Sequence, residues 1–179
     1  MRDGPELSSG EQVISRIDKI TEVAAHVAAW MIFSIGVMVT YEVVMRKVFN
    51  SPTIWVDEIA RFFQVWAVYL ASAHILKRRS LITVELFTGS LAMNKLRLLE
   101  LLSLVIIGFF SFVALYYGTG VVFESIEMGR RTSTMLGVPK WLTESAIPVG
   151  FGLLFVQSVV EFLKLVRGDD VAALAGHQV

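Results

Sequence analysis

The sequence contains no cysteine and carries no net charge, and each absence excludes a class of function. Without cysteine there are no disulfides, no thiol nucleophile and no thiolate metal site. The 16 basic residues are balanced by 16 acidic ones. The chain therefore lacks the basic excess that a nucleic-acid partner requires, and we expect none.

Charged residues of either sign are also scarce. They make up 18% of the 179 residues, whereas hydrophobic residues make up 55%. A soluble domain of this size rarely has so few charges. The composition therefore predicts that most of the chain lies in lipid.

Long apolar runs account for this composition. The run from Ile59 to Leu76 would form a helix of about 27 Å, close to the thickness of the hydrocarbon core of a bilayer. Since backbone groups in lipid must satisfy one another, the runs are predicted to be helices. The predicted fold is an all-α integral membrane protein with four transmembrane helices, at about residues 23–45, 55–76, 98–123 and 141–166. Residues 1–22 and 168–179 would flank this membrane domain of residues 23–167, and the first span is read as a retained helix that is not cleaved.

The distribution of basic residues predicts the orientation of the spans. The N-terminal segment, the middle loop and the tail together carry ten lysines and arginines, against five in the two loops on the other side. By the positive-inside rule both termini should be cytoplasmic.

The loops that join the spans differ in length. Residues Asn50 to Thr53 include Pro52 and predict a tight outer turn, which would make the first two spans an antiparallel hairpin. The cytoplasmic loop, residues 77–97, has apolar residues among polar ones and is expected to hold a short interfacial helix. In the outer loop, residues 124–140, Pro139 is expected in the first turn of the fourth span.

Three charges stand at the beginning of the second span. Arg61 follows Asp57 by four residues and Glu58 by three, so one helix face could hold an ionic cluster with Arg61 at its centre. Glu42 in the first span falls at a similar depth, although Arg46 competes for it. Asp57 and Glu58 could instead complement the positive end of the second helix, an effect of about 0.3 to 1 kcal/mol.

The second span has a small side and an aromatic side. Ala60, Ala67 and Ala71 would allow a close helix contact within the chain, and the aromatic side would then face a partner or lipid. The aromatic side consists of Phe62, Trp66 and Tyr69. Trp55 and Trp141 lie at the outer ends of their helices, where indole rings favour the membrane interface.

The order of short motifs resembles a known family, the small membrane subunit of tripartite ATP-independent periplasmic (TRAP) transporters. The resemblance extends over nearly the whole chain from the first span onward. It rests on Arg46 and Phe49, on Trp55-Val56-Asp57-Glu58 with Arg61 and Trp66, on Lys77-Arg78-Arg79 before Ile82-Thr83-Val84-Glu85, on Val138-Pro139-Lys140-Trp141, and on Ile147-Pro148-Val149-Gly150. One position departs from the pattern, because Leu81 stands where the family often has histidine.

The resemblance implies a division of labour among three proteins. A periplasmic binding protein would capture a small organic anion such as a dicarboxylate, and a large membrane subunit would carry it inward with a sodium gradient. The chain would act as the scaffold of the large subunit, without catalysis and without a cofactor. Its partners would be the large subunit, the binding protein and membrane lipid, in the inner membrane of a bacterium. From the residues themselves, Arg130 and Arg131 in the outer loop are either a contact to the binding protein or solvated loop charges. Apart from the resemblance, the sequence shows no polar site near the middle of the membrane that would suggest a route for a substrate.

Two other functions remain open from the residues. His26 and His74 fall near the cytoplasmic ends of neighbouring spans, so a four-helix haem anchor with two histidine ligands is an alternative. A small proton-coupled exporter is another, although it would want a carboxylate near the middle of the first span, and Glu42 lies close to one end.

Overall fold

The computed structural model describes residues 9–78, 93–133 and 137–167. These residues form helices without any β-strand, apart from an isolated bridge between Arg131 and Pro139. The helices are α1 (Ser9–Val48), α2 (Ile54–Lys77), α4 (Met93–Glu127), α5 (Trp141–Glu144) and α6 (Ala146–Arg167). Four stretches are long and apolar enough to cross a membrane: Gln12–Val48, Ile54–Lys77, Arg97–Glu127 and Trp141–Val166. The predicted fold of four membrane helices is confirmed.

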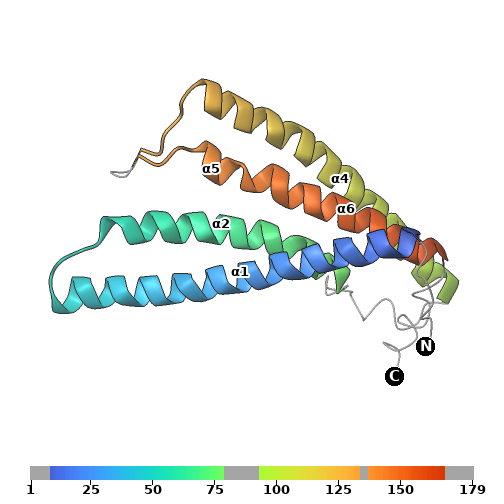
Figure 1. Cartoon of the computed structure of the whole chain (residues 1–179), viewed down its shortest axis with the longest axis horizontal. Coiled ribbons are helices and arrows are strands. Elements are labelled where there is room, and N and C mark those ends of the chain that lie inside the picture. Colours follow the sequence, from blue (N-terminus) through green and yellow to red (C-terminus); the bar gives the residue numbers. More distant parts are fainter. Residues whose placement is uncertain (1–8, 79–92, 134–136, 168–179) are drawn as a thin grey trace, which may run out of the picture.

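The helices lie in an open row rather than in a closed bundle. α1 packs on α2, α2 packs on α6, and α6 packs on α4, so the order across the row is α1, α2, α6, α4 (Figure 1). α1 and α4 form its edges, and they separate widely at the end that holds the α1–α2 turn. At the other end α1 crosses towards α6 and makes a smaller contact with it. The row can be viewed as two helical hairpins, α1–α2 and α4–α6, joined along α2 and α6.

The turn between α1 and α2 is tight. The amide groups of Phe49 and Ser51 both donate to the carbonyl oxygen of Met45, and each nitrogen–oxygen distance is 3.2 Å. Asn50 adopts a φ of 50°, a left-handed conformation that asparagine tolerates better than most residues. The hairpin predicted from Pro52 and its neighbours is therefore present.

Small residues allow α4 and α6 to approach closely. Gly108, Ser111, Gly118 and Ser125 are all buried along one side of α4. A Cβ atom placed on Gly118 would lie 2.9 Å from the Cγ2 atom of Ile147, which is closer than atoms in real contacts. Small side chains of this kind let membrane helices pack by van der Waals contact.

The last span is interrupted at Ser145, between α5 and α6. Pro148 has no amide hydrogen, so it cannot donate to the carbonyl of Glu144 as a helix would require. The helix is interrupted directly after Glu144, whose carbonyl lacks this donor. Pro139 does not lie in the first turn of the helix as predicted; it lies two residues before α5 and pairs with Arg131 instead.

Some predictions fall outside the described residues. They are the interfacial helix of the middle loop with Arg79 and Glu85, and the end segments 1–8 and 168–179. At the borders of the middle loop, α2 continues to Lys77 and α4 already begins at Met93, before the apolar run of the third span.

The chain buries little of its own surface. In the most apolar part of α1 and of α4, 11% of residues are buried, against 33% in the last span. The last span lies inside the row, whereas the edge helices expose large apolar side chains such as Trp30, Phe109 and Phe110. In a membrane, lipid or another protein covers these edges.

Candidate functional site

A buried polar network joins three helices at the end of the row away from the α1–α2 turn. Gln157 of α6 is fully buried and lies at its centre. The Gln157 Oε1 atom lies 2.9 Å from the hydroxyl of Thr21 in α1, and its Nε2 atom donates to Glu161 at 2.9 Å and to Asp18 at 3.2 Å. The amide thus uses both its donor and its acceptor, as a buried polar group should.

Two lysines balance the two carboxylates of this network. The Lys164 ammonium lies 3.0 Å from Asp18 and 3.1 Å from Glu161. Lys77, at the end of α2, donates to the backbone carbonyl of Asp18 at 3.3 Å and lies 4.0 Å from its carboxylate. We call these six residues the polar clamp: Asp18, Thr21, Lys77, Gln157, Glu161 and Lys164. Their two negative and two positive charges cancel, which suits a site close to lipid.

The polar clamp was not predicted from the sequence. It lies at the end of the row away from the α1–α2 turn, where Lys77 is the last residue of α2. The signal was the spacing of Gln157, Glu161 and Lys164 at four and three residues, which places all three on one face of a helix.

Arg97 makes a further link at this end of the row. Its guanidinium donates to the carbonyl oxygens of Leu165 at 2.8 Å and of Val166 at 3.2 Å. These carbonyls lie near the end of the described part of α6. The contact therefore ties α4 to the end of α6.

The charged residues at the other end of the row are arranged differently from the predicted cluster. Glu42 is buried and pairs with Arg46 at 3.5 Å. Arg61 is exposed and makes no ion pair or hydrogen bond with any described residue. Asp57 is exposed as well, and both carboxylate oxygens of Glu58 are buried without a hydrogen-bond partner. The structure thus does not bring Arg61 together with Glu42, Asp57 or Glu58.

Trp66 and Tyr69 on the aromatic side of α2 pack against the last span, so the prediction that this side faces a partner or lipid was wrong for these two residues. The Trp66 indole donates to the carbonyl of Leu142 at 3.0 Å. The rings of Tyr69 and Phe151 lie 5.6 Å apart, and Tyr69 also contacts Gly150. The glycine on α6 leaves room for the tyrosine, which a reading of α2 alone could not show. Ala67 on the small side is buried, as predicted.

The two ends of the outer loop between α4 and α5 pair with each other. Thr132 donates to the carbonyl of Val138 at 2.9 Å, and Lys140 donates to that of Arg130 at 3.0 Å. The Arg130 side chain pairs with Glu124 at 2.6 Å. Arg131 is exposed and has no ion pair with a described residue. Of the two arginines predicted to contact a binding protein, Arg131 is thus the one with a free guanidinium in the described part of the chain.

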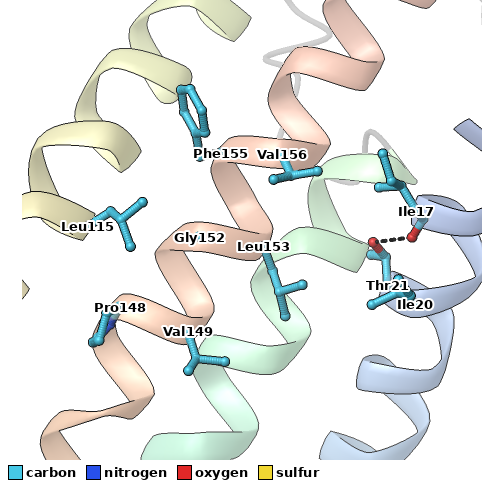
Figure 2. A pocket seen from close by; sticks show the side chains of 10 residues that line it. All are labelled: Ile17, Ile20, Thr21, Leu115, Pro148, Val149, Gly152, Leu153, Phe155 and Val156. Carbon is cyan, nitrogen blue, oxygen red and sulfur yellow. Dashed lines mark hydrogen bonds between the residues drawn. The ribbon is translucent and has the colours of Figure 1, made fainter. Parts of the chain in front are cut away.

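An apolar groove of about 500 Å³ lies on α6, between α1 and α4 (Figure 2). Its lining residues are Ile17, Ile20, Thr21, Leu115, Pro148, Val149, Gly152, Leu153, Phe155 and Val156. The one hydroxyl among these side chains, that of Thr21, already lies within hydrogen-bond distance of Ile17 and Gln157. The lining therefore offers no charge and no free donor to an organic anion.

Among the remaining predicted residues, Trp55, Trp141 and Arg78 lie at helix ends, whereas His26 lies within α1. Trp55 and Trp141 are about 40% exposed, and the ring of Trp55 lies 6.3 Å from that of Tyr41. Arg78 follows the last turn of α2, and its amide donates to the carbonyl of His74. His26 is exposed, with Nδ1 2.8 Å from the carbonyl of Glu22, whereas the Nδ1 atom of His74 is buried without a partner.

Comparison with known proteins identifies the family. Residues 35–168 match the family described as tripartite ATP-independent periplasmic transporters, DctQ component. The chain belongs to this family. The match covers the last part of α1 and the whole of α2, α4, α5 and α6. It therefore includes the three polar clamp residues of α6, and it also includes the charged residues at the start of α2. The chain is a small permease subunit of a TRAP transporter and a multi-pass membrane protein.

Two relatives are similar along much of the chain. The sialic acid TRAP transporter small permease protein SiaQ of Vibrio cholerae is 26% identical over 97% of this chain and 98% of the relative. The isethionate TRAP transporter permease protein DctMQ of Oleidesulfovibrio alaskensis is 26% identical over 65% of this chain. That match covers 18% of the relative, so this chain corresponds to a small part of a larger permease.

Proposed function

We propose that this subunit is a non-catalytic scaffold for the large permease subunit of a sodium-driven transporter. The observation that carries the proposal is the open row of helices. Its edge helices α1 and α4 leave most of their apolar surface uncovered, so the fold provides a broad membrane surface for another protein. The longer DctMQ relative supports the same reading, because in that protein a similar segment is part of a larger permease chain.

The interior of the row supports a scaffold rather than a path for the substrate. The charges of the polar clamp neutralise one another, and the groove beside it is apolar. A route for an organic anion would need donors or positive charges that are free to bind it. The groove offers none, and in this proposal the residues that bind the substrate belong to the other two proteins.

The substrate in this proposal is a small organic anion delivered by a periplasmic binding protein. The two relatives are named for sialic acid and isethionate, and both compounds are organic acids. Both termini of the subunit are cytoplasmic in this proposal, as the ten-to-five distribution of basic residues favours. The outer loop with Arg131 then faces the periplasm.

Deletion and reconstitution test the scaffold function. The large subunit would be expressed with and without this chain, purified, and assayed for sodium-dependent uptake in proteoliposomes with its binding protein. We expect the two membrane subunits to purify together, and uptake to be lost when this chain is omitted. Full uptake by the large subunit alone would contradict the proposal, as would uptake by this chain alone.

A further inference from the structure

Three polar side chains form a stripe on the outer face of α2. Asp57, Arg61 and Gln64 are spaced by four and three residues, so they lie on the same face of the helix, and all three are exposed. We call them the α2 polar stripe. The same face continues with Val68 and Ile75, which are 60% and 43% exposed. None of these five residues lines the groove on α6.

Gln64 lies deep in the membrane. It is roughly 15 Å along the axis from Ile54, close to the middle of the 24-residue helix. Arg61 lies about one turn nearer the end of the helix. The long arginine side chain could extend towards the interface, but the glutamine side chain is too short to do so. An amide that faces hydrocarbon at this depth would leave its donors and acceptor without partners.

Other hydroxyl groups on exposed faces of the spans are satisfied by their own helix. Ser34 donates to the carbonyl of Trp30, Thr40 to Gly36, Ser103 to Leu99 and Thr119 to Tyr116, at 2.7 to 2.9 Å. Such bonds hide a polar group from lipid without any partner helix. Arg61 and Gln64 have no such bond with a described residue. The α2 polar stripe therefore differs from the lipid-facing surface around it.

Neighbouring groups do not neutralise Arg61 within the described residues. Glu42 is held by Arg46, and the carboxylate of Glu58 is buried on another face of α2. Asp57 shares the stripe, yet it forms no ion pair with Arg61 in the structure. A positive charge at membrane depth is stabilised by an anion or by several acceptors, and the described residues place none within ion-pair or hydrogen-bond distance of Arg61.

We infer that the α2 polar stripe is covered by a transmembrane helix of the large permease subunit, an assignment that rests on the proposed function. The chemistry of the stripe defines what that helix must present. A carboxylate, or a set of carbonyl oxygens, lies opposite Arg61, and a side chain able to both donate and accept a hydrogen bond lies opposite Gln64. Interhelical bonds of this kind fix the register of two membrane helices as well as holding them together.

A second copy of this chain fits the stripe poorly. Two copies inserted in the same orientation place equivalent residues at equal depth, and a two-fold interface brings the same patch of each copy together. Arg61 would then face Arg61 of the other copy. This like-charge contact disfavours self-association through the stripe.

Apolar substitutions separate a docking role from a role within the subunit. Gln64→Leu and Arg61→Leu would be introduced in the co-expressed transporter, with Val159→Leu as the control, at an exposed position of α6 outside the groove. We expect each stripe variant to lower recovery of the large subunit with this chain about tenfold, because each loses an interhelical bond, and the control to leave it unchanged. The melting temperature of the isolated small subunit should stay within error of wild type in all three variants. Unchanged recovery with both stripe variants would overturn the assignment, and so would an equal loss of stability in the isolated subunit.

Photo-cross-linking gives a second measurement on the same complex. Benzoylphenylalanine at position 64 should cross-link to the large subunit, whereas the same group at position 159 on α6 should not. Cross-links from position 64 to a second copy of this chain, or to lipid alone, would contradict the inference. If the wild-type chain does not purify with the large subunit at all, the scaffold function itself fails; if wild type does and the variants do as well, only the stripe fails.

Discussion

Gly150 of α6 lies directly against Tyr69 of α2. A Cβ atom placed on Gly150 would collide with the Cβ atom of Tyr69 and would lie 3.0 Å from its backbone oxygen. The backbone of Tyr69 cannot turn aside as a flexible side chain can. This contact therefore sets how closely the two hairpins of the row can approach.

Substitution of Gly150 should force α2 and α6 apart. We expect Gly150→Ala to destabilise the subunit by about 1 to 3 kcal/mol, the usual range for overpacking. Thermal unfolding in a defined detergent would measure the effect. Gly120→Ala in α4 is a matched control, because nothing lies within 4 Å of a Cβ atom at that position. Equal stability of the two variants would show that the Gly150 contact is not close in the protein.

Lys164 should be important for stability because it serves two carboxylates at once. In Lys164→Met, Asp18 and Glu161 keep the bonds from Gln157 but lose their nearest positive charge. We expect a loss of about 1 to 3 kcal/mol, below the 3 to 5 kcal/mol of a fully buried pair, because the Lys164 and Asp18 side chains are about 20% exposed.

Arg130→Met provides the comparison for Lys164. Its pair with Glu124 is more exposed, at 38% and 49%, and such surface pairs contribute about 0 to 1 kcal/mol.

The double variant Lys164→Met with Asp18→Asn should be less destabilised than the sum of the single variants, since it removes both charges of one pair. Strict additivity would mean that the two side chains do not interact.

Arg131 should affect docking of the binding protein more than Arg130 does. A change of either arginine to glutamate reverses the charge that a partner protein would meet. The effect should be larger at Arg131, because the guanidinium of Arg130 already forms an ion pair with Glu124. We expect Arg131→Glu to slow uptake most at low concentrations of the binding protein and at low salt, because rim charges mainly set association rates. Recovery of the large subunit should be unchanged. Identical uptake by wild type and by the Arg130→Glu, Arg131→Glu double variant would contradict the predicted contact.

The orientation of the subunit is open to a direct test. Reporter fusions within residues 85–95 should be active in the form that requires the cytoplasm, and fusions within residues 131–138 in the form that requires the periplasm. The opposite pattern would invert the proposed topology and would place the α2 polar stripe in the other leaflet.

The helices could be predicted from the sequence, but their arrangement could not. Apolar runs of sufficient length determine that a segment crosses a membrane, and Pro52 marks the turn of the first hairpin. Which faces meet depends on pairs of residues far apart in the chain. From the sequence of α2 alone, Tyr69 was expected to face outward. It packs inward because Gly150 of α6 leaves space for its ring, and the sequence does not reveal that these two residues meet.

The polar groups show the same limit. Glu42 had two candidate partners at similar depth, Arg46 and Arg61, and helix spacing could not decide between them; the structure favours Arg46. Gln64 and Gln157 were both overlooked because one neutral amide hardly changes the hydropathy of a span. Only the structure separates them, since Gln157 is fully buried and bonded whereas Gln64 is exposed.

The polar clamp also has a consequence for how the protein is made. Asp18 lies in α1, which is synthesised before the other described helices, and Gln157, Glu161 and Lys164 lie in α6, which is synthesised after them. The α1–α2 hairpin can enter the membrane while α6 is still being synthesised, but the clamp closes only after α6 has inserted. A chain that stops before α6 therefore keeps Asp18 without Gln157 and Lys164. The contact distinguishes a subunit in which α6 has inserted from one in which it has not.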